Sequence, residues 1–159
     1  MTTTARWLLA SCVIMAASIF SGCATTGFYD YDFTRAQVAG TWTSTTESID
    51  IELDVRDDGT FSATDWPQAL YCGGVTAEYT RDSPQLASPK LAYSGEWSIG
   101  DQGANYEIRF VSTDENCRSN WSAQAWKNPS GTELRLWLDL ASSPDSVTDE
   151  SILYLSKTR

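Results

Sequence analysis

The sequence predicts an all-β domain, an antiparallel meander β-barrel of about eight strands, with a two-sheet β-sandwich as the alternative. Short segments alternate between apolar and polar residues, as half-buried strands do. Gly, Asp, Asn and Pro residues mark turns between these segments, and no long stretch shows helical periodicity. Strands joined by hairpins in chain order form a meander, and eight strands can close it so that no edge stays free.

The first hairpin begins at residues 48–55, SIDIELDV, where every second residue is Ile, Leu or Val and the residues between are acidic. The following turn, RDDGT, places Gly59 in the left-handed position of a three-residue loop. This turn predicts that Val55 lies opposite Phe61 and Leu53 opposite Ala63, so that apolar side chains face each other.

The second hairpin joins residues 91–99, LAYSGEWSI, to 105–112, NYEIRFVS, across the polar loop GDQGA. Its glycine at position 95 would leave room for an aromatic ring on the facing strand. The expected pairs are Ile99 with Tyr106, Trp97 with Ile108, and Gly95 with Phe110.

The third hairpin joins residues 120–127 to 132–140 across the turn NPSG, in which Pro and Gly suit a type I turn. On one face the expected pairs are apolar: Ala125 with Leu134, Ala123 with Leu136, and Trp121 with Leu138. The other face is expected to carry Trp126 with Glu133, Gln124 with Arg135, and Ser122 with Trp137.

Three further strands are expected at 40–44, around 75–79 and at 152–157, and a short helical turn at 34–38. The chain then divides into a signal peptide (1–22), a tether or linker (23–37) and the barrel domain (38–159).

The first 22 residues have the organisation of an export signal. Arg6 supplies a positive charge, Trp7–Phe20 is apolar, and Ser21 and Gly22 are small residues at a cleavage position. As a helix the apolar stretch would span about 21 Å, less than the roughly 30 Å hydrocarbon core of a bilayer. We therefore expect a leader that is removed.

Phe20–Cys23, FSGC, resembles the lipobox of bacterial lipoproteins, in which the peptidase cuts before the cysteine and its sulfur carries diacylglycerol. The resemblance implies lipidation of Cys23 and an exported protein anchored to the cell membrane or outer membrane, facing away from the cytoplasm. The family prefers an aliphatic residue where this chain has Phe20. Leu9–Cys12 matches that preference better but lies too close to Arg6. The alternative is an ordinary secretory signal with a spare cysteine at position 23.

Charge excludes some partners. The 159 residues include 21 acidic and 11 basic residues and no His, a net charge of -10, and loss of Arg6 with the leader leaves 10 basic residues and a net charge of -11. Such a chain repels the phosphates of nucleic acid and an anionic bilayer. We therefore expect no nucleic-acid partner, and membrane contact through the lipid anchor.

Cys72 and Cys117 remain as an even pair in an oxidising compartment and are expected to form a disulfide. This bridge would close a loop of about 46 residues and stabilise the fold by roughly 4 kcal/mol. A redox pair or metal site is the alternative, but the chain has neither His nor a CxxC motif. We expect no metal and no cofactor.

Residues 33–42, FTRAQVAGTW, are similar to the start of the lipocalin family, where a short helical turn precedes Gly-x-Trp in the first strand. In that family the Trp closes one end of the barrel and packs against a basic residue near the last strand. The resemblance implies this role for Trp42, with Lys157 or Arg159 as its partner. The same motif recurs as Gly95-Glu96-Trp97, so the alternative is that Gly and Trp simply begin a strand and fill the core.

Two places could bind a ligand. On the outer face, Trp126 and Trp137 lie with Gln124 and Arg135, and an aromatic pair beside such groups suits sugar stacking or a protein contact. Trp66 is expected on an outer face or loop as well. Burial against a loop or against lipid headgroups would explain these residues equally well.

The second place is the interior, where Trp97 and Trp121 point inward and, with Trp42 and Tyr93, could surround a small apolar ligand. Core filling is the alternative. An eight-stranded interior barely leaves room for large side chains, which favours the outer site.

Catalysis has little support in the sequence. Without His there is no Ser-His-Asp or Cys-His site, and Glu133 and Asp139 would lie about 20 Å apart along a strand, too far for a glycosidase pair. Residues 54–59 carry Arg56 where a calcium loop needs an oxygen ligand. We therefore expect no catalytic residues, and a binding module for a protein or cell-wall glycan, or alternatively a lipocalin-like carrier of a small apolar ligand.

Overall fold

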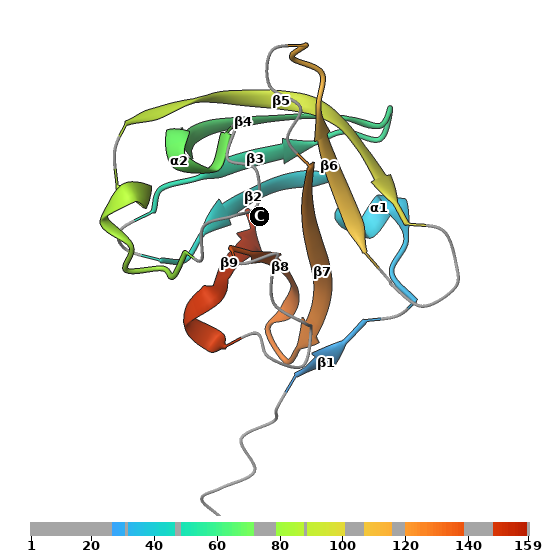
Figure 1. The fold of residues 1–159 in the computed structure, drawn as a ribbon. Helices are drawn as coiled ribbons and strands as arrows, with labels where there is room; N and C mark the ends of the chain where they lie inside the picture. Colours follow the sequence, from blue (N-terminus) through green and yellow to red (C-terminus); the bar gives the residue numbers. More distant parts are fainter. Residues whose placement is uncertain are drawn as a thin grey trace, which may run out of the picture.

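In the computed structural model the chain forms a closed antiparallel β-barrel (Figure 1). The structure describes residues 27–30, 32–46, 49–71, 79–87, 89–100, 107–115, 120–138 and 148–158. Each strand from β2 to β8 pairs with the next strand along the chain, and β9 pairs back onto β2 and closes the barrel. The predicted meander barrel is thus confirmed, and the sandwich alternative does not form. The eight strands are β2 (Gly40–Ser44), β3 (Glu52–Val55), β4 (Thr60–Pro67), β5 (Lys90–Ile99), β6 (Ile108–Ser112), β7 (Asn120–Asn128), β8 (Gly131–Trp137) and β9 (Ile152–Lys157).

The β3–β4 hairpin has the predicted register. Val55 lies opposite Phe61 and Leu53 opposite Ala63, and Gly59 in the turn has a φ of 91°. The apolar residues of segment 49–55 are all buried, while the acidic residues between them are exposed or half-buried. Strict alternation therefore identified the inner face of the barrel here.

The β7–β8 hairpin also has the register that its turn predicts. Asn128 lies opposite Gly131, so the apolar pairs point inward and the polar pairs outward. The confirmed pairs are Ala125 with Leu134, Ala123 with Leu136, Trp126 with Glu133, and Gln124 with Arg135.

The β5–β6 hairpin differs from the prediction by two residues. Ile99 lies opposite Ile108, so that Trp97 faces Phe110, and Gly95 faces Ser112 instead of Phe110. The connection is longer than the GDQGA loop, because the backbone N–H of Gly100 donates to the carbonyl oxygen of Glu107 at 2.7 Å. A shift of two residues leaves every side chain on its expected face.

Gly95 is needed for a different reason from the one expected. A Cβ atom at this position would lie 1.9 Å from the carbonyl oxygen of Val111 on β6. The glycine therefore admits the neighbouring backbone, not the ring of Phe110.

A bulge in β4 places Trp66 in the core and corrects the prediction of an outer position. The pairing of β4 with β5 shifts between Ala63 and Trp66, and Asp65 has a φ of 54°. The extra residue reverses the alternation, so Trp66 points inward and is only 1% exposed.

Aromatic side chains fill much of the barrel interior. Trp66 stacks on Tyr93 with 4.7 Å between ring centroids, and Phe61 lies 5.0 Å from Tyr93. Phe110 meets Phe61 edge to face at 5.2 Å. The largest fully buried side chains are Trp42, Trp66, Tyr93, Phe61 and Phe110.

The short helix α1 (Arg35–Val38) confirms the predicted helical turn, and its last residue, Val38, is buried in the core. Trp42 on β2 donates its indole N–H to the carbonyl oxygen of Val38 at 2.7 Å. The ammonium of Lys157 lies 5.4 Å from the centroid of the Trp42 ring and donates to the carbonyl oxygen of Gln37 at 3.0 Å. Lys157 thus occupies the place expected for a basic partner of Trp42.

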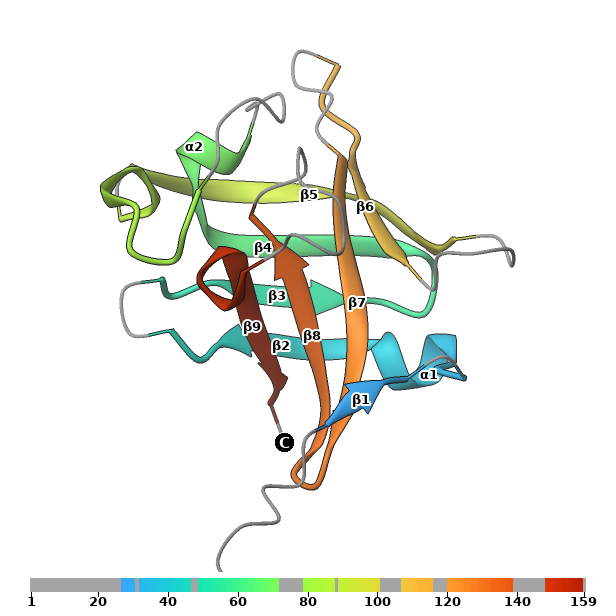
Figure 2. The ribbon, with the colours of Figure 1, turned by 60° about the horizontal axis from the view of Figure 1, so that its bottom comes forward.

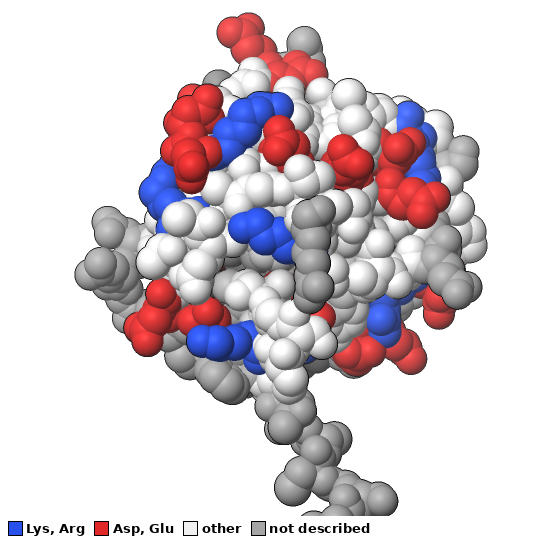
Figure 3. All heavy atoms as spheres, turned by 180° about the vertical axis from the view of Figure 1, so that it is seen from behind, with Lys and Arg blue, Asp and Glu red and all other residues white. Residues whose placement is uncertain are grey.

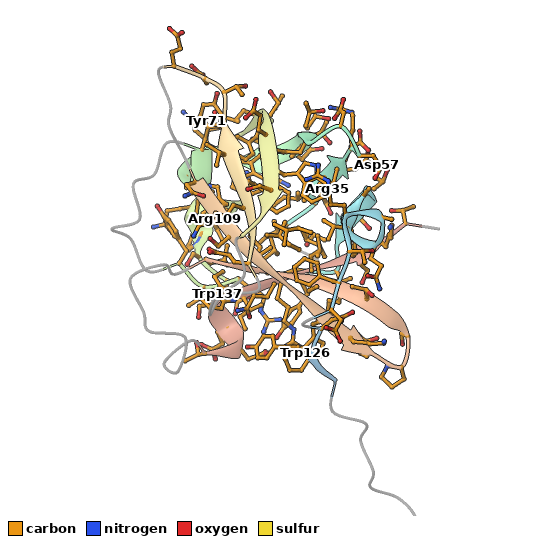
Figure 4. The ribbon with its side chains drawn as sticks, turned by 90° about the vertical axis from the view of Figure 1, so that its right-hand side faces the viewer. Arg35, Asp57, Tyr71, Arg109, Trp126 and Trp137 are labelled. Carbon is orange, nitrogen blue, oxygen red and sulfur yellow. The ribbon has the colours of Figure 1, made fainter. Side chains whose placement is uncertain are left out.

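Arg35 links α1 to the turn between β3 and β4 by a hydrogen bond and to β5 by a cation–π contact. Its guanidinium lies 4.3 Å from the ring centroid of Trp97 and donates to the carbonyl oxygen of Asp57 at 3.3 Å. Figure 4 shows Arg35 and Asp57 side by side at this point.

The segment expected to be a spacer is packed against the barrel where the structure describes it. A short strand β1 (Phe28–Tyr29) pairs with β7, with Tyr29 opposite Trp126. Because β6 pairs with β7 only as far as Ala123, the same edge of β7 remains open at Trp126 and Lys127, where β1 pairs with it. Phe33 is buried in the core, 8% exposed.

The barrel has two distinct ends, which we call the α1 end and the α2 end (Figure 2). The α1 end carries α1, β1, the β7–β8 turn and the last described residues of the chain. The α2 end carries α2 (Gln68–Tyr71), where Trp121 donates its indole N–H to the carbonyl oxygen of Leu70 at 3.0 Å. Two 3-10 turns, η1 (Pro84–Leu86) and η3 (Asp149–Ser151), complete the described elements.

Several expectations lie outside the described residues. These are the leader at 1–22, the lipidation site Cys23, most of the strand around 75–79, the cysteines Cys72 and Cys117, and residues Asp139 and Arg159. None of the described helices is both long enough and apolar enough to cross a membrane.

Candidate functional site

Three of the nominated residues come together on the outer wall formed by β7 and β8. Arg135 lies directly over Trp126, with 3.5 Å between the guanidinium carbon and the ring centroid. Its Nε is 3.0 Å from Oε1 of Glu133, and both side chains are less than one-fifth exposed. Gln124 lies opposite Arg135 in the ladder. The hairpin register brings these groups together as the sequence indicated.

The cluster continues onto β9. The guanidinium of Arg135 lies 5.1 Å from the ring centroid of Tyr154, and that of Arg81 lies 5.3 Å from the same ring. Arg81 also pairs with Asp149 at 2.6 Å. Aromatic rings and guanidinium groups thus alternate along the row Trp126, Arg135, Tyr154 and Arg81, which we call the cation–π row.

Tyr154 holds its proton firmly in this environment. Burial, and then a hydrogen bond that its hydroxyl donates to the Asp149 carboxylate, raise the pKa of Tyr154 to about 12. The same hydrogen bond, with the Arg81 charge, lowers the pKa of Asp149. Neither group is poised for proton transfer near neutral pH, which fits a structural role for the row.

Trp126 is enclosed on several sides, contrary to what a sugar-stacking platform requires. Arg135 covers one face of its ring, and Tyr29 meets it edge to face with 4.6 Å between centroids. A Cβ atom at Gly27 would lie 2.0 Å from the indole nitrogen, so only glycine fits against Trp126 there. Trp126 is therefore the residue on which the segment before the barrel rests.

The other nominated tryptophans are not part of this cluster. Trp137 is half-buried on β8, opposite Ile152 and four residues beyond Glu133, and Figure 4 shows it apart from Trp126 along the wall. Trp66 lies inside the barrel, as described above. Trp97 points inward as expected, is 3% exposed, and donates its indole N–H to the carbonyl oxygen of Arg56 at 2.7 Å.

Two grooves lie at the α1 end, outside the barrel interior. One, of about 500 Å³, we call the Asp30 groove, and the other, of about 550 Å³, the hairpin groove; both have Gln37 in their walls. The Asp30 groove is lined by Gly27, Tyr29, Asp30, Asp32, Gln37, Trp126 and Lys127. The hairpin groove is lined by Ala36, Gln37, Asn128, Ser130, Gly131, Thr132, Glu133, Ser156, Lys157 and Thr158.

Asp30 is the most unusual residue of the first groove. It is 8% exposed, its backbone N–H donates to the carbonyl oxygen of Ala125 at 3.1 Å, and its Oδ1 accepts the backbone N–H of Asp32 at 3.2 Å. Its Oδ2 is buried and has no hydrogen-bond partner in the part of the chain that the structure describes. A buried acceptor without a donor costs about 1–3 kcal/mol, so this position is suited to a donor from outside the chain.

Charge is intermingled over the molecular surface. On the side opposite to that of Figure 1, acidic and basic side chains alternate without gathering in one patch (Figure 3). Within the described ranges, no group of three or more His, Cys, Asp or Glu residues could hold a metal ion.

The Asp30 groove is not predicted from the sequence. Residues 28–33, FYDYDF, alternate aromatic and acidic side chains without a clear period, and they carried no sign of a partner strand. The available signal was the composition, because two aromatic-acidic pairs are costly to leave in an exposed spacer. Only the pairing of β1 with β7 shows which of these side chains is buried.

Comparisons with known proteins give no relative for this chain. No protein-family model, no curated protein and no solved structure matches it.

Proposed function

We propose that the protein is an exported lipoprotein, held at the membrane by diacylglycerol on Cys23, whose barrel is a non-catalytic binding module. Its partner is a protein or a cell-wall glycan, bound outside the barrel at the α1 end. One observation carries this proposal: the two grooves lie outside the barrel beside the segment that enters it, whereas bulky aromatic side chains occupy the interior. A ligand thus finds space outside the wall.

The hairpin groove has the chemistry to bind such a partner. It combines the amides of Gln37 and Asn128 with four hydroxyl groups, and its charges are limited to Glu133 and Lys157. Amides and hydroxyls both donate and accept hydrogen bonds, as do sugar hydroxyls and peptide groups. The four hydroxyl-bearing residues are Ser130, Thr132, Ser156 and Thr158.

The seating of β1 supports a short tether. Only three residues lie between Cys23 and Gly27, and the four steps along the chain from one to the other can span at most roughly 14 Å. Since Gly27 rests on Trp126, a lipid on Cys23 would keep the α1 end close to the membrane surface. Two acyl chains would make this attachment lasting.

We also propose the disulfide between Cys72 and Cys117. The phenol of Tyr71, one residue before Cys72, donates to Oδ2 of Asp114 at 2.7 Å, three residues before Cys117. This hydrogen bond raises the pKa of Tyr71. Described residues within three positions of each cysteine thus meet at the α2 end, which supports a bridge between the two loops.

A lipocalin-like carrier of a small apolar ligand is the second candidate. The contact of Lys157 with Trp42 favours it, because that arrangement is the one implied by the resemblance to lipocalins. Its ligand would have to enter an interior that already holds Trp66 stacked on Tyr93.

Mass spectrometry of the native protein tests the anchor. We expect diacylglycerol on Cys23 and no residues of the leader. An unmodified amino-terminal cysteine on a freely diffusing protein would contradict the proposal.

Binding assays separate the two candidate functions. Fragments of cell wall should bind the purified full-length protein, and the variants Thr132→Val and Ser156→Ala should weaken this binding about tenfold, while Thr64→Val on the exposed face of β4 should not. Displacement of an apolar fluorescent dye by fatty acids, without any binding of glycan or protein, would instead support the carrier.

A further inference from the structure

We infer that the Asp30 groove binds the primary ammonium group of an ethanolamine phospholipid in the membrane that carries the anchor. The inference deepens the proposed function, and it rests on the anchoring at Cys23 only for the way in which the lipid is brought to the groove. It assigns to this groove a contact with the bilayer surface that is separate from the binding of a protein or glycan.

Asp30 lacks a hydrogen-bond donor for one of its carboxylate oxygens among the described residues. Asp30 is more than nine-tenths buried in the groove wall, one of its carboxylate oxygens accepts the backbone N–H of Asp32, and the other has no donor among the described residues. A primary ammonium group supplies three N–H donors and a positive charge, so it satisfies this oxygen better than a neutral donor does. Asp32, also in the groove wall, adds a second acidic group.

A cationic side chain, Lys127, lines the same groove as Asp30. Phe28 lies opposite Lys127 in the short β1–β7 ladder, so Asp30 and Lys127 are diagonal neighbours on one face of it. Such diagonal neighbours lie roughly 7–8 Å apart, and their Cβ atoms are somewhat closer than this. A ligand that bears both an ammonium group and a phosphate can therefore contact the carboxyl group and the lysine at once.

The Asp30 groove is also close along the chain to the proposed lipid on Cys23. Gly27 forms part of its wall and lies four residues after Cys23, so the groove would lie within roughly 14 Å of the attached lipid. Tyr29 and Trp126 form its aromatic side, and these two residue types are favoured where an apolar phase meets water.

Charge selects among headgroups. The mature chain has a net charge of -11, which disfavours phospholipids whose headgroup carries only a negative charge. Ethanolamine phospholipids have no net charge and carry N–H donors, whereas choline phospholipids have no net charge but a quaternary ammonium without any N–H. Of these two headgroups, only ethanolamine can donate an N–H hydrogen bond to Asp30.

The test compares two soluble headgroups that differ in N–H donors. The full-length protein, purified from membranes in a neutral detergent, is titrated with O-phosphoethanolamine and with phosphocholine, and binding is followed by calorimetry and by tryptophan fluorescence. We expect phosphoethanolamine to bind at least tenfold more tightly. Equal affinities, or no binding of either compound, would overturn the inference.

Variants locate the site. Asp30→Asn keeps the Oδ1 acceptor for Asp32 but loses the charge, and should weaken phosphoethanolamine binding at least tenfold. Lys127→Ala, at an exposed position, should weaken it severalfold without loss of folding. Asp82→Asn, a matched change on an exposed residue far along the chain, should have no effect. Unchanged binding in both groove variants would exclude the Asp30 groove.

Two further arms identify the source of the ammonium group. Vesicles of phosphatidylcholine with phosphatidylethanolamine should change the tryptophan fluorescence of the protein more than vesicles of phosphatidylcholine alone. Lysine or glucosamine binding as tightly as phosphoethanolamine would assign the groove to an amine of a peptide or glycan and overturn the lipid assignment. If Cys23 proves unmodified while phosphoethanolamine still binds, the proposed lipid anchor is wrong and the proposed binding of the headgroup is retained.

Discussion

The contact between Arg135 and Trp126 allows a direct test of whether the cation–π row stabilises the outer wall. The guanidinium carbon lies 3.5 Å from the ring centroid, and the Arg135 side chain is 19% exposed. A cation–π contact at such a partly desolvated site contributes about 1–2 kcal/mol. We therefore expect a coupling free energy of about 1 kcal/mol between these two residues.

A double-mutant cycle measures this coupling. Arg135→Ala alone should cost about 2–3 kcal/mol of unfolding free energy, because it also leaves the carboxylate of Glu133, 18% exposed, without its guanidinium partner. Trp126→Leu removes the ring but keeps an apolar side chain. Chemical denaturation of the wild type, both single variants and the double variant yields the coupling term.

The control pairs Trp126→Leu with Arg109→Ala. Arg109 is an outward-facing arginine on β6, paired with Glu107 at 3.1 Å and opposite Ser122, four residues from Trp126 on β7. These two substitutions should be additive within about 0.3–0.5 kcal/mol. A coupling no larger for Arg135 than for Arg109 would refute the view that the cation–π row stabilises this wall.

Three other predictions follow from the geometry. Gly95→Ala should lower the unfolding free energy by about 1–3 kcal/mol, because its Cβ would meet the Val111 carbonyl oxygen at 1.9 Å, and the outward-facing change Ser94→Ala should leave thermal stability nearly unchanged. The pKa of Tyr154 is raised from 10 to about 12, so the Tyr154 hydroxyl keeps its proton to a higher pH in the folded protein than in the unfolded chain. The resulting stabilisation is present below pH 10 and falls as pH rises toward about 12. Denaturation across this pH range should show a smaller pH-dependent loss of stability in Tyr154→Phe. If the proposed bridge exists, reduction, or Cys72→Ser, should cost roughly 4 kcal/mol of stability, and no change on adding a reductant would argue against it.

How far the sequence predicted the fold depended on its turns. The turns at Gly59 and at Asn128–Gly131 set hairpin registers that the structure confirms, because each turn type admits few ways to pair the strands. The GDQGA loop has no such constraint, and the predicted register of β5–β6 was wrong by two residues. The bulge at Asp65 was also invisible, since a pattern of period two does not show where an extra residue is inserted.

The candidate site was predictable in part. Trp126, Gln124 and Arg135 were placed together correctly because the hairpin register determines which side chains share a face. That Arg135 and the segment before the barrel would enclose Trp126 depends on contacts far apart in sequence. A strand of two residues such as β1 is too short to show any alternation, so Asp30 could be found only from the structure.

The closure of β9 onto β2 has a practical consequence for work in cells. It brings Thr158 into the same groove wall as Ala36, so the carboxyl end of the chain emerges beside the segment through which the chain enters the barrel (Figure 2). A fluorescent reporter or purification tag attached directly after Thr158 would lie beside the hairpin groove and, through the shared wall at Gln37, close to the Asp30 groove, and would obstruct ligands there. The exposed turn at Pro84–Gln85, far along the chain from both ends, is the better place for an inserted epitope.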